Sequence, residues 1–225
     1  MDLLFPNLNC GYCSRWRSRV TIFFIRRQID QAERHRRDDI KRKGRVFRAR
    51  LTFAASELSQ YAKNCIYYLV QLKNEFDARE GRERIKPAVI CPTYPRDAVS
   101  ALTESIEPAD IEDAKCIAEI IESTQIQKSR LEDLLPSING DGPYGHNVVV
   151  TKHYFYDDIR DALGLYKRAD TLFGYARREQ DHIEPICDAE GAKNTLRVTM
   201  NITDVELFQA IDREWPPLLL QLDNN

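Results

Sequence analysis

No proline interrupts the chain between Pro6 and Pro87, and apolar residues recur at helical spacing through the second half of that stretch. Steps of three and four residues place side chains on one face of an α-helix. The members of this stripe are Leu51, Ala54, Ala55, Leu58, Tyr61, Ala62, Cys65, Tyr68, Leu69, Leu72 and Phe76. We therefore predict a long helix from about residue 15 to residue 79 with this stripe buried. Gly81 suits a left-handed cap at its end.

Prolines and glycines divide the remainder of the chain into further helices. The predicted segments are an extended linker at 87–95, helices at 95–106, 108–135 and 148–178, a loop at 136–143, and a last helix from Thr203. Pro108 suits a first helical turn, and Glu206 three residues after Thr203 suits a capping box. The run 195–202 alternates weakly and is compatible with one short strand, for which no partner is evident.

Two of these helices carry apolar stripes of their own. The first is Ile111, Ala114, Ile117, Ala118, Ile121, Ile126 and Leu131; the second is His153, Phe155, Tyr156, Ile159, Leu163, Tyr166, Ala169, Leu172, Phe173 and Ala176. The sequence thus predicts an all-α fold, a helical bundle with a long, basic, protruding N-terminal helix. The expected division is a disordered tail at 1–14, a basic helical arm at 15–45 and a bundle domain at 46–225.

Charge is distributed unevenly along the 225 residues. The segment 15–50 holds 14 Arg and Lys against 4 Asp and Glu, a net charge of +10, whereas 51–225 carries −11. We predict binding to an anionic surface through Arg26, Arg27, Arg34, Arg36, Arg37, Lys41, Arg42, Lys43, Arg45 and Arg48. These charges point all around a helix, which favours a diffuse field over base-specific recognition. The same field allows the alternative that the segment binds nucleic acid.

A short apolar run, Val20, Ile22, Phe23, Phe24 and Ile25, is bounded by arginines and predicts an interfacial wedge. It is about 9 Å long as a helix, too short to cross a bilayer. Ile22, Ile25, Ile29 and Ala32 also keep a heptad-like coiled-coil spacing, which ends at Arg36 and predicts a weak homodimer.

Three stretches resemble a group of uncharacterised bacterial proteins in which an N-terminal membrane helix leads into a basic coil and a helical domain. They are 25–29 (IRRQI), 48–62 (RARL through ELSQYA) and 172–179 (LFGYARRE). The resemblance implies that 20–25 is the cytoplasmic end of a membrane anchor, flanked by positive charge. Arg15, Arg17 and Arg19 prevent residues 3–25 from spanning, so the anchor is missing here. A cytoplasmic location at the inner face of the membrane follows.

Motifs that could carry chemistry lack the context that each requires. Cys10 and Cys13 form a CxxC without a second ligand pair, and without a secretory signal we expect free thiols, with Cys65 and Cys116 in the core. His153, Asp157 and Asp161 share a helix face but are best interpreted as polar groups beside a core stripe. Asp110, Glu112 and Lys115 resemble a nuclease signature on a helix, and Asp181-His182 follows a helix end.

No catalytic residue, cofactor site or metal site is predicted. The expected function is that of a non-enzymatic, membrane-surface-associated helical scaffold or interaction protein.

Overall fold

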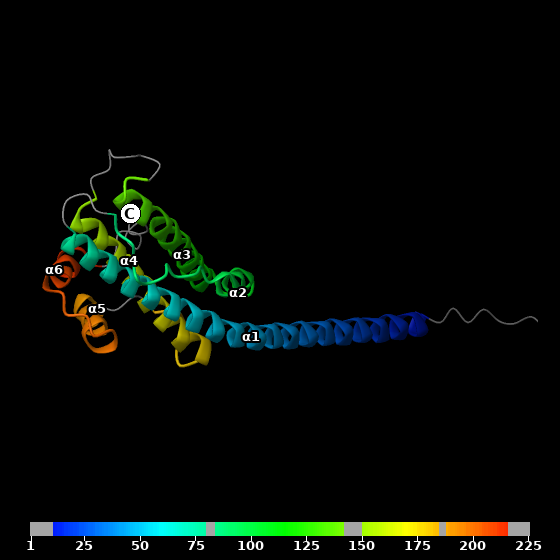
Figure 1. Cartoon of the computed structure of the whole chain (residues 1–225). Helices are drawn as coiled ribbons and strands as arrows, with labels where there is room; N and C mark the ends of the chain where they lie inside the picture. Colours follow the sequence, from blue (N-terminus) through cyan, green and yellow to red (C-terminus); the bar gives the residue numbers. More distant parts are fainter. Residues whose placement is uncertain (1–10, 80–83, 142–149, 185–187, 216–225) are drawn as a thin grey trace, which may run out of the picture. The chain divides into compact units, whose positions relative to one another are not determined.

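The computed structural model describes residues 11–79, 84–141, 150–184 and 188–215. For 11–26, 37, 39–41 and 43–45 the description covers the backbone alone. The elements are α1 (Gly11–Ala78), α2 (Arg96–Ile106), α3 (Ile111–Ile138), α4 (Lys152–Arg177), α5 (Ala189–Asn194), the π-helical turn η2 (Thr195–Thr199) and α6 (Val205–Glu214), as seen in Figure 1. Within the described ranges every regular element is helical, which confirms the prediction of an all-α bundle.

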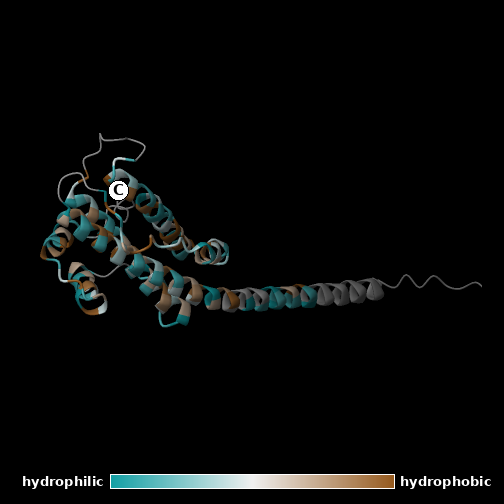
Figure 2. Cartoon of the chain, in the orientation of Figure 1, coloured by the Kyte–Doolittle hydropathy of each residue, from teal (hydrophilic) through white to brown (hydrophobic). Residues whose placement is uncertain are grey.

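The chain divides into two compact units, Met1–Val46 and Phe47–Asn225. In the second unit α2 packs against α3, α3 against α4, and α4 against α5 and α6. The later part of α1 joins this bundle, for example where the ring of Phe76 lies 5.3 Å from that of Phe155 on α4. Hydrophobic and hydrophilic residues alternate along these helices, as expected for amphipathic elements around one core (Figure 2).

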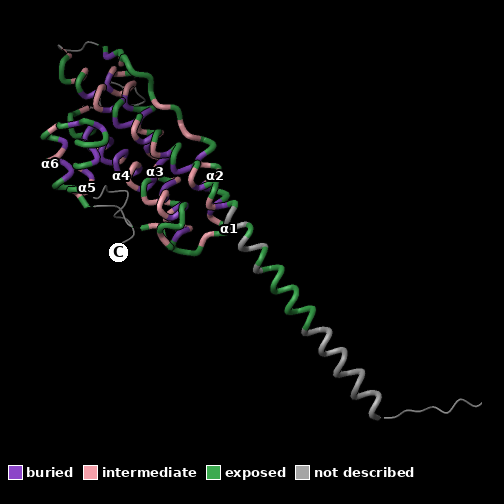
Figure 3. Tube along the Cα trace, turned by 90° about the horizontal axis from the view of Figure 1, so that it is seen from below, coloured by how far each residue is buried: buried purple, intermediate pink, exposed green. Residues whose placement is uncertain are grey.

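The stripe predicted on α1 is buried. Leu51, Leu58 and Leu72 are fully enclosed, and Phe76 at its end is partly buried. In Figure 3 buried residues recur along this part of α1, whereas the described residues before Phe47 are exposed. The predicted cap at Gly81 lies outside the described residues.

Both ends of α3 differ from the prediction. Pro108 does not open the helix, because Asp110 is the N-cap and its side chain accepts a hydrogen bond from the backbone N–H of Asp113. Helix α3 also continues through Pro136 to Ile138, where a loop was predicted. A proline removes one donor and its ring crowds the carbonyl four residues earlier, but here it lies in the last helical turn, so little of the hydrogen-bond ladder is lost.

The buried face of α3 also differs in its residues from the predicted stripe. Its buried members are Asp113, Ile117, Ile120, Thr124, Gln127, Leu131, Leu134 and Ile138. Ile111, predicted to be buried, is instead among the most exposed hydrophobic residues. The steps of three and four residues are kept, but three members are polar, so apolarity alone placed the face incorrectly.

Helix α4 largely follows its predicted stripe. Phe155, Ile159 and Leu172 are fully buried, but His153 is exposed, and the helix begins at Lys152 rather than near residue 148. The helix ends at Arg177, and its C-cap Arg178 adopts a left-handed conformation (φ 64°). The backbone N–H of Glu179 then donates to the carbonyl of Gly174 at 2.9 Å, which closes the helix end.

The segment predicted as a possible short strand is helical. Helix α5 runs into η2, whose wide turn is closed by the Met200 N–H donating to the Thr195 carbonyl at 3.2 Å. A helical turn satisfies its own backbone groups, whereas a lone strand would leave them unpaired. Helix α6 is capped by Asp204, one residue after the predicted Thr203.

Asp204 joins two elements, and its removal should be measurable. One carboxylate oxygen accepts from the Leu207 N–H at 3.0 Å, and the other lies 2.9 Å from the Nζ of the largely buried Lys73 on α1. Losing a cap removes about 1 kcal/mol, and leaving a buried amine with one partner fewer adds roughly another. We expect Asp204→Ala to lower the free energy of unfolding by about 2 kcal/mol, measured by urea denaturation.

Asp188 provides the matched control, because it caps α5 through Gly191 at 2.8 Å and is exposed. Asp188→Ala should remove only the contribution of a cap, about 1 kcal/mol. Equal losses for the two variants would show that the Lys73 contact contributes nothing.

Candidate functional site

The basic segment is the first candidate. Residues 27–36 are all exposed, including Arg27, Arg34 and Arg36, and Arg42 further along is exposed as well. Even the apolar Ile29 is 53% exposed. The described arginines of this segment, Arg27, Arg34, Arg36 and Arg42, are therefore accessible to solvent.

Several predicted surface residues fall outside the side chains that are described. These are the five members of the wedge together with Arg26, Arg37, Lys41, Lys43 and Arg45. Arg48 is described, and it is half-buried within the second unit. Its guanidinium carbon lies 4.8 Å from the centre of the Tyr175 ring, and Nη1 donates to the Tyr175 carbonyl at 3.4 Å. Arg48 thus contacts the last turn of α4, where a cation is favoured by the helix dipole.

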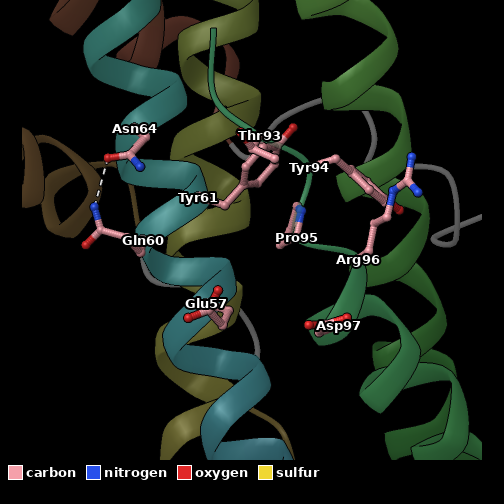
Figure 4. Close-up of a pocket in the computed structure, with 9 residues that line it drawn as sticks. All are labelled: Glu57, Gln60, Tyr61, Asn64, Thr93, Tyr94, Pro95, Arg96 and Asp97. Carbon is pink, nitrogen blue, oxygen red and sulfur yellow. Dashed lines mark hydrogen bonds between the residues drawn. The ribbon is translucent and has the colours of Figure 1, made fainter. Parts of the chain in front are cut away.

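A second candidate is an open pocket of about 430 Å³ between α1 and the start of α2. Figure 4 shows Tyr61 facing Tyr94 and Pro95, with Glu57 and Asp97 on opposite sides of one end. The two tyrosine rings lie edge to face, 6.4 Å apart. The remaining lining residues are Gln60, Asn64, Thr93 and Arg96.

This pocket offers hydrogen-bonding groups and carboxylates rather than a nucleophile beside a base. Its lining contains no His, Cys or Lys. The nearby Cys65 is fully buried, and burial raises the pKa of its thiol to about 12. Because the thiolate is the reactive form, Cys65 is a small core residue, as predicted.

The acidic face predicted on α4 is engaged by arginines. Asp157 pairs with Arg160 at 3.2 Å, Asp161 pairs with Arg130 of α3, and His153 packs its ring against Tyr156. His153, Asp157 and Asp161 therefore do not converge on a common point. This agrees with their interpretation as polar groups beside the core.

The fold and these sites define a helical bundle with an exposed basic segment. Comparison with protein-family models, curated proteins and solved structures finds no match to this chain. Among the residues described, no helix contains a window apolar enough and long enough to span a bilayer.

Proposed function

We propose that this protein is a non-enzymatic interaction or scaffold protein that binds anionic membrane surfaces through a long basic helix within residues 15–50. The observation that carries the proposal is the uninterrupted exposure of residues 27–36. Exposed arginines on this segment can meet an anionic surface without any rearrangement of the helix.

The charge distribution supports the same proposal. The basic segment carries +10 and the rest of the chain from residue 51 carries −11. An anionic membrane attracts the first and repels the second, so the segment would serve as the contact and the bundle, beginning near Val46, would remain in solution. The apolar wedge at 20–25 would add burial at the interface, since electrostatics and insertion together give an anchor that neither gives alone.

Full-length protein should therefore sediment with phosphatidylserine-containing vesicles at low salt and dissociate as the salt concentration rises. Each basic residue near such a surface contributes about 1 kcal/mol. The double substitution of Arg34→Gln and Arg36→Gln should weaken binding about 30-fold at low salt, measured by vesicle co-sedimentation. Replacing Phe23 and Phe24 by serine should weaken the fraction of binding that resists salt.

The matched control carries Arg96→Gln and Arg213→Gln, which remove the same charge from exposed positions of the bundle. It should bind vesicles as the wild type does. Equal losses for the two double variants would show that net charge, not the basic helix, determines binding.

Duplex DNA at the same salt tests the alternative, because its phosphates attract the same arginines. Tighter binding to DNA than to vesicles would replace the membrane proposal by nucleic-acid binding.

A further inference from the structure

Two aspartates at the start of α3 lie beside a histidine in the turn that follows α4. Asp110 is the N-cap of α3, Asp113 lies three residues on, and His182 follows the end of α4 at Arg177. The turn is fixed there by the Ile183 N–H, which donates to Asp113 Oδ1 at 3.0 Å. The three side chains therefore belong to elements that the fold already holds together.

In each carboxylate one oxygen accepts a hydrogen bond from a backbone N–H, and the other oxygen faces His182. Asp110 Oδ1 accepts from the Asp113 N–H at 3.0 Å, and Asp113 Oδ1 accepts from Ile183. The remaining oxygens, Oδ2 of Asp110 and Oδ2 of Asp113, lie 3.7 and 3.8 Å from His182 Nδ1. Such backbone hydrogen bonds orient the carboxylates, as outer contacts do for metal ligands.

The buried environment of Asp113 Oδ2 is the observation that indicates a ligand. The side chain is only 2% exposed, and Oδ2 accepts no hydrogen bond although it is buried. A buried carboxylate oxygen without a donor is strongly unfavourable, so a cation at this position would relieve it. The three candidate ligand atoms all lie within 4.8 Å of one another.

Tyr175 and Arg48 also lie near this position. The Tyr175 hydroxyl interacts with the Asp113 carboxyl group from the side of α4. The guanidinium of Arg48 contacts the ring of Tyr175 and the carbonyl at the end of α4.

We propose that Asp110, Asp113 and His182 form a divalent-cation site suited to Zn²⁺. One imidazole nitrogen with two carboxylate oxygens is a donor set that Zn²⁺ accepts, whereas Mg²⁺ and Ca²⁺ favour oxygen alone. Ligand atoms around tetrahedral zinc are about 3.3 Å apart. The two separations from His182 need a contraction of roughly 0.4–0.5 Å, which the His182 side chain, 73% exposed, can supply. The two carboxylate oxygens lie within 4.8 Å of each other, and the exposed side chain of Asp110 can move toward Asp113.

The site would have a structural role that is independent of the proposed membrane binding. Zinc would join the first turn of α3 to the turn after α4, and its two positive charges would balance the two carboxylates. Three protein ligands leave a fourth position for water, so this site would be more open than a structural zinc site with four protein ligands.

Zinc titration of the full-length protein after dialysis against a chelator tests this proposal. We expect one equivalent to bind and to raise the melting temperature by about 5–10 °C at a free zinc concentration 100 times the dissociation constant. His182→Ala should weaken zinc binding about 100-fold, with little change in the melting temperature of the metal-free protein, because His182 is exposed.

His153→Ala is the matched control, since His153 is exposed and lies outside the cluster. It should bind zinc as the wild type does, so that a loss in His182→Ala is assigned to this site and not to the removal of any exposed histidine or to zinc bound by cysteine thiols. Asp113→Asn should abolish the zinc-dependent rise in melting temperature. The absence of stoichiometric binding, or an equal affinity for the His182→Ala and His153→Ala variants, would overturn the proposal.

Discussion

Asp158→Asn is expected to stabilise the protein at pH 8 by up to about 4 kcal/mol and to have little effect near pH 4. Asp158 and Asp161 are both largely buried on α4 and share one cation, Arg130 of α3. Arg130 bonds closely to Asp161, while its Nη1 lies 3.4 Å from Asp158. Burial, only partly opposed by Arg130, raises the pKa of Asp158 from 3.8 to about 7.

The direction of the pH dependence follows from this raised pKa. Between pH 4 and pH 7 the folded protein retains the proton on Asp158 and the unfolded chain has released it, so the free energy of unfolding falls as pH rises. Above pH 7 the buried carboxylate is ionised, and the folded protein bears the full free-energy cost of burying that charge. Asparagine mimics the neutral acid at every pH, and Arg130 keeps Asp161 as its partner.

Urea denaturation at pH 4, 6 and 8 measures this effect. Asp157→Asn is the matched control, because Asp157 is half-exposed and pairs with Arg160. It should shift the pH profile of stability only slightly, because the charge of Asp157 raises the pKa of Asp158 less than burial does. A loss of stability at pH 8 in Asp158→Asn would mean that the pair with Arg130 outweighs the burial of Asp158.

The buried face of α1 was predictable because it is built almost wholly from apolar residues. The face of α4 was predictable because its apolar members outnumber the buried Asp158, Arg160 and Arg168, which an apolar pattern does not predict. The face of α3 was not, since Asp113, Thr124 and Gln127 occupy buried positions that an apolar pattern assigns to solvent. Thr124 is accommodated by donating to the carbonyl of Ile120 at 2.7 Å, a hydrogen bond within its own helix. Local bonds of this kind are invisible in a hydrophobic pattern.

Helix ends were the least predictable parts of the fold. Pro136 and the residues after it have the composition of a loop, yet α3 includes Pro136 because helix packing in its last turn outweighs one missing donor. Likewise Thr203 and Asp204 are both good N-caps, and the structure has Asp204 in that position, where its carboxylate also pairs with Lys73 of α1.

The candidate metal site could not be recognised from the spacing of its residues along the sequence. Asp110 and His182 lie 72 residues apart on different elements, and the short patterns in which each occurs do not connect them. The folding of the turn after α4 against the start of α3 brings them together. By contrast, the basic segment is evident in the sequence, because charge density requires no tertiary contact.

The later part of α1 should be an integral part of the folded bundle, and two substitutions on this one helix distinguish its faces. Leu58 is fully buried and Phe53, five residues earlier, is 51% exposed. Truncating a buried leucine loses its transfer free energy and leaves a cavity that close-packed neighbours fill only in part. We expect Leu58→Ala to lower the free energy of unfolding by about 3 kcal/mol.

Phe53→Ala removes a larger side chain from the same helix, so it controls for side-chain size and for any change in helix propensity. Because much of the ring remains in water, its removal should change stability by about 0.5 kcal/mol or less. Chemical denaturation of both variants gives the comparison.

Similar losses of stability would mean that α1 does not present the Leu58 face to the core. A small loss for Leu58→Ala alone would mean that this part of α1 is not cooperatively folded with α3 and α4. If the basic helix acts as proposed, neither substitution should change vesicle binding under conditions in which the variants remain folded.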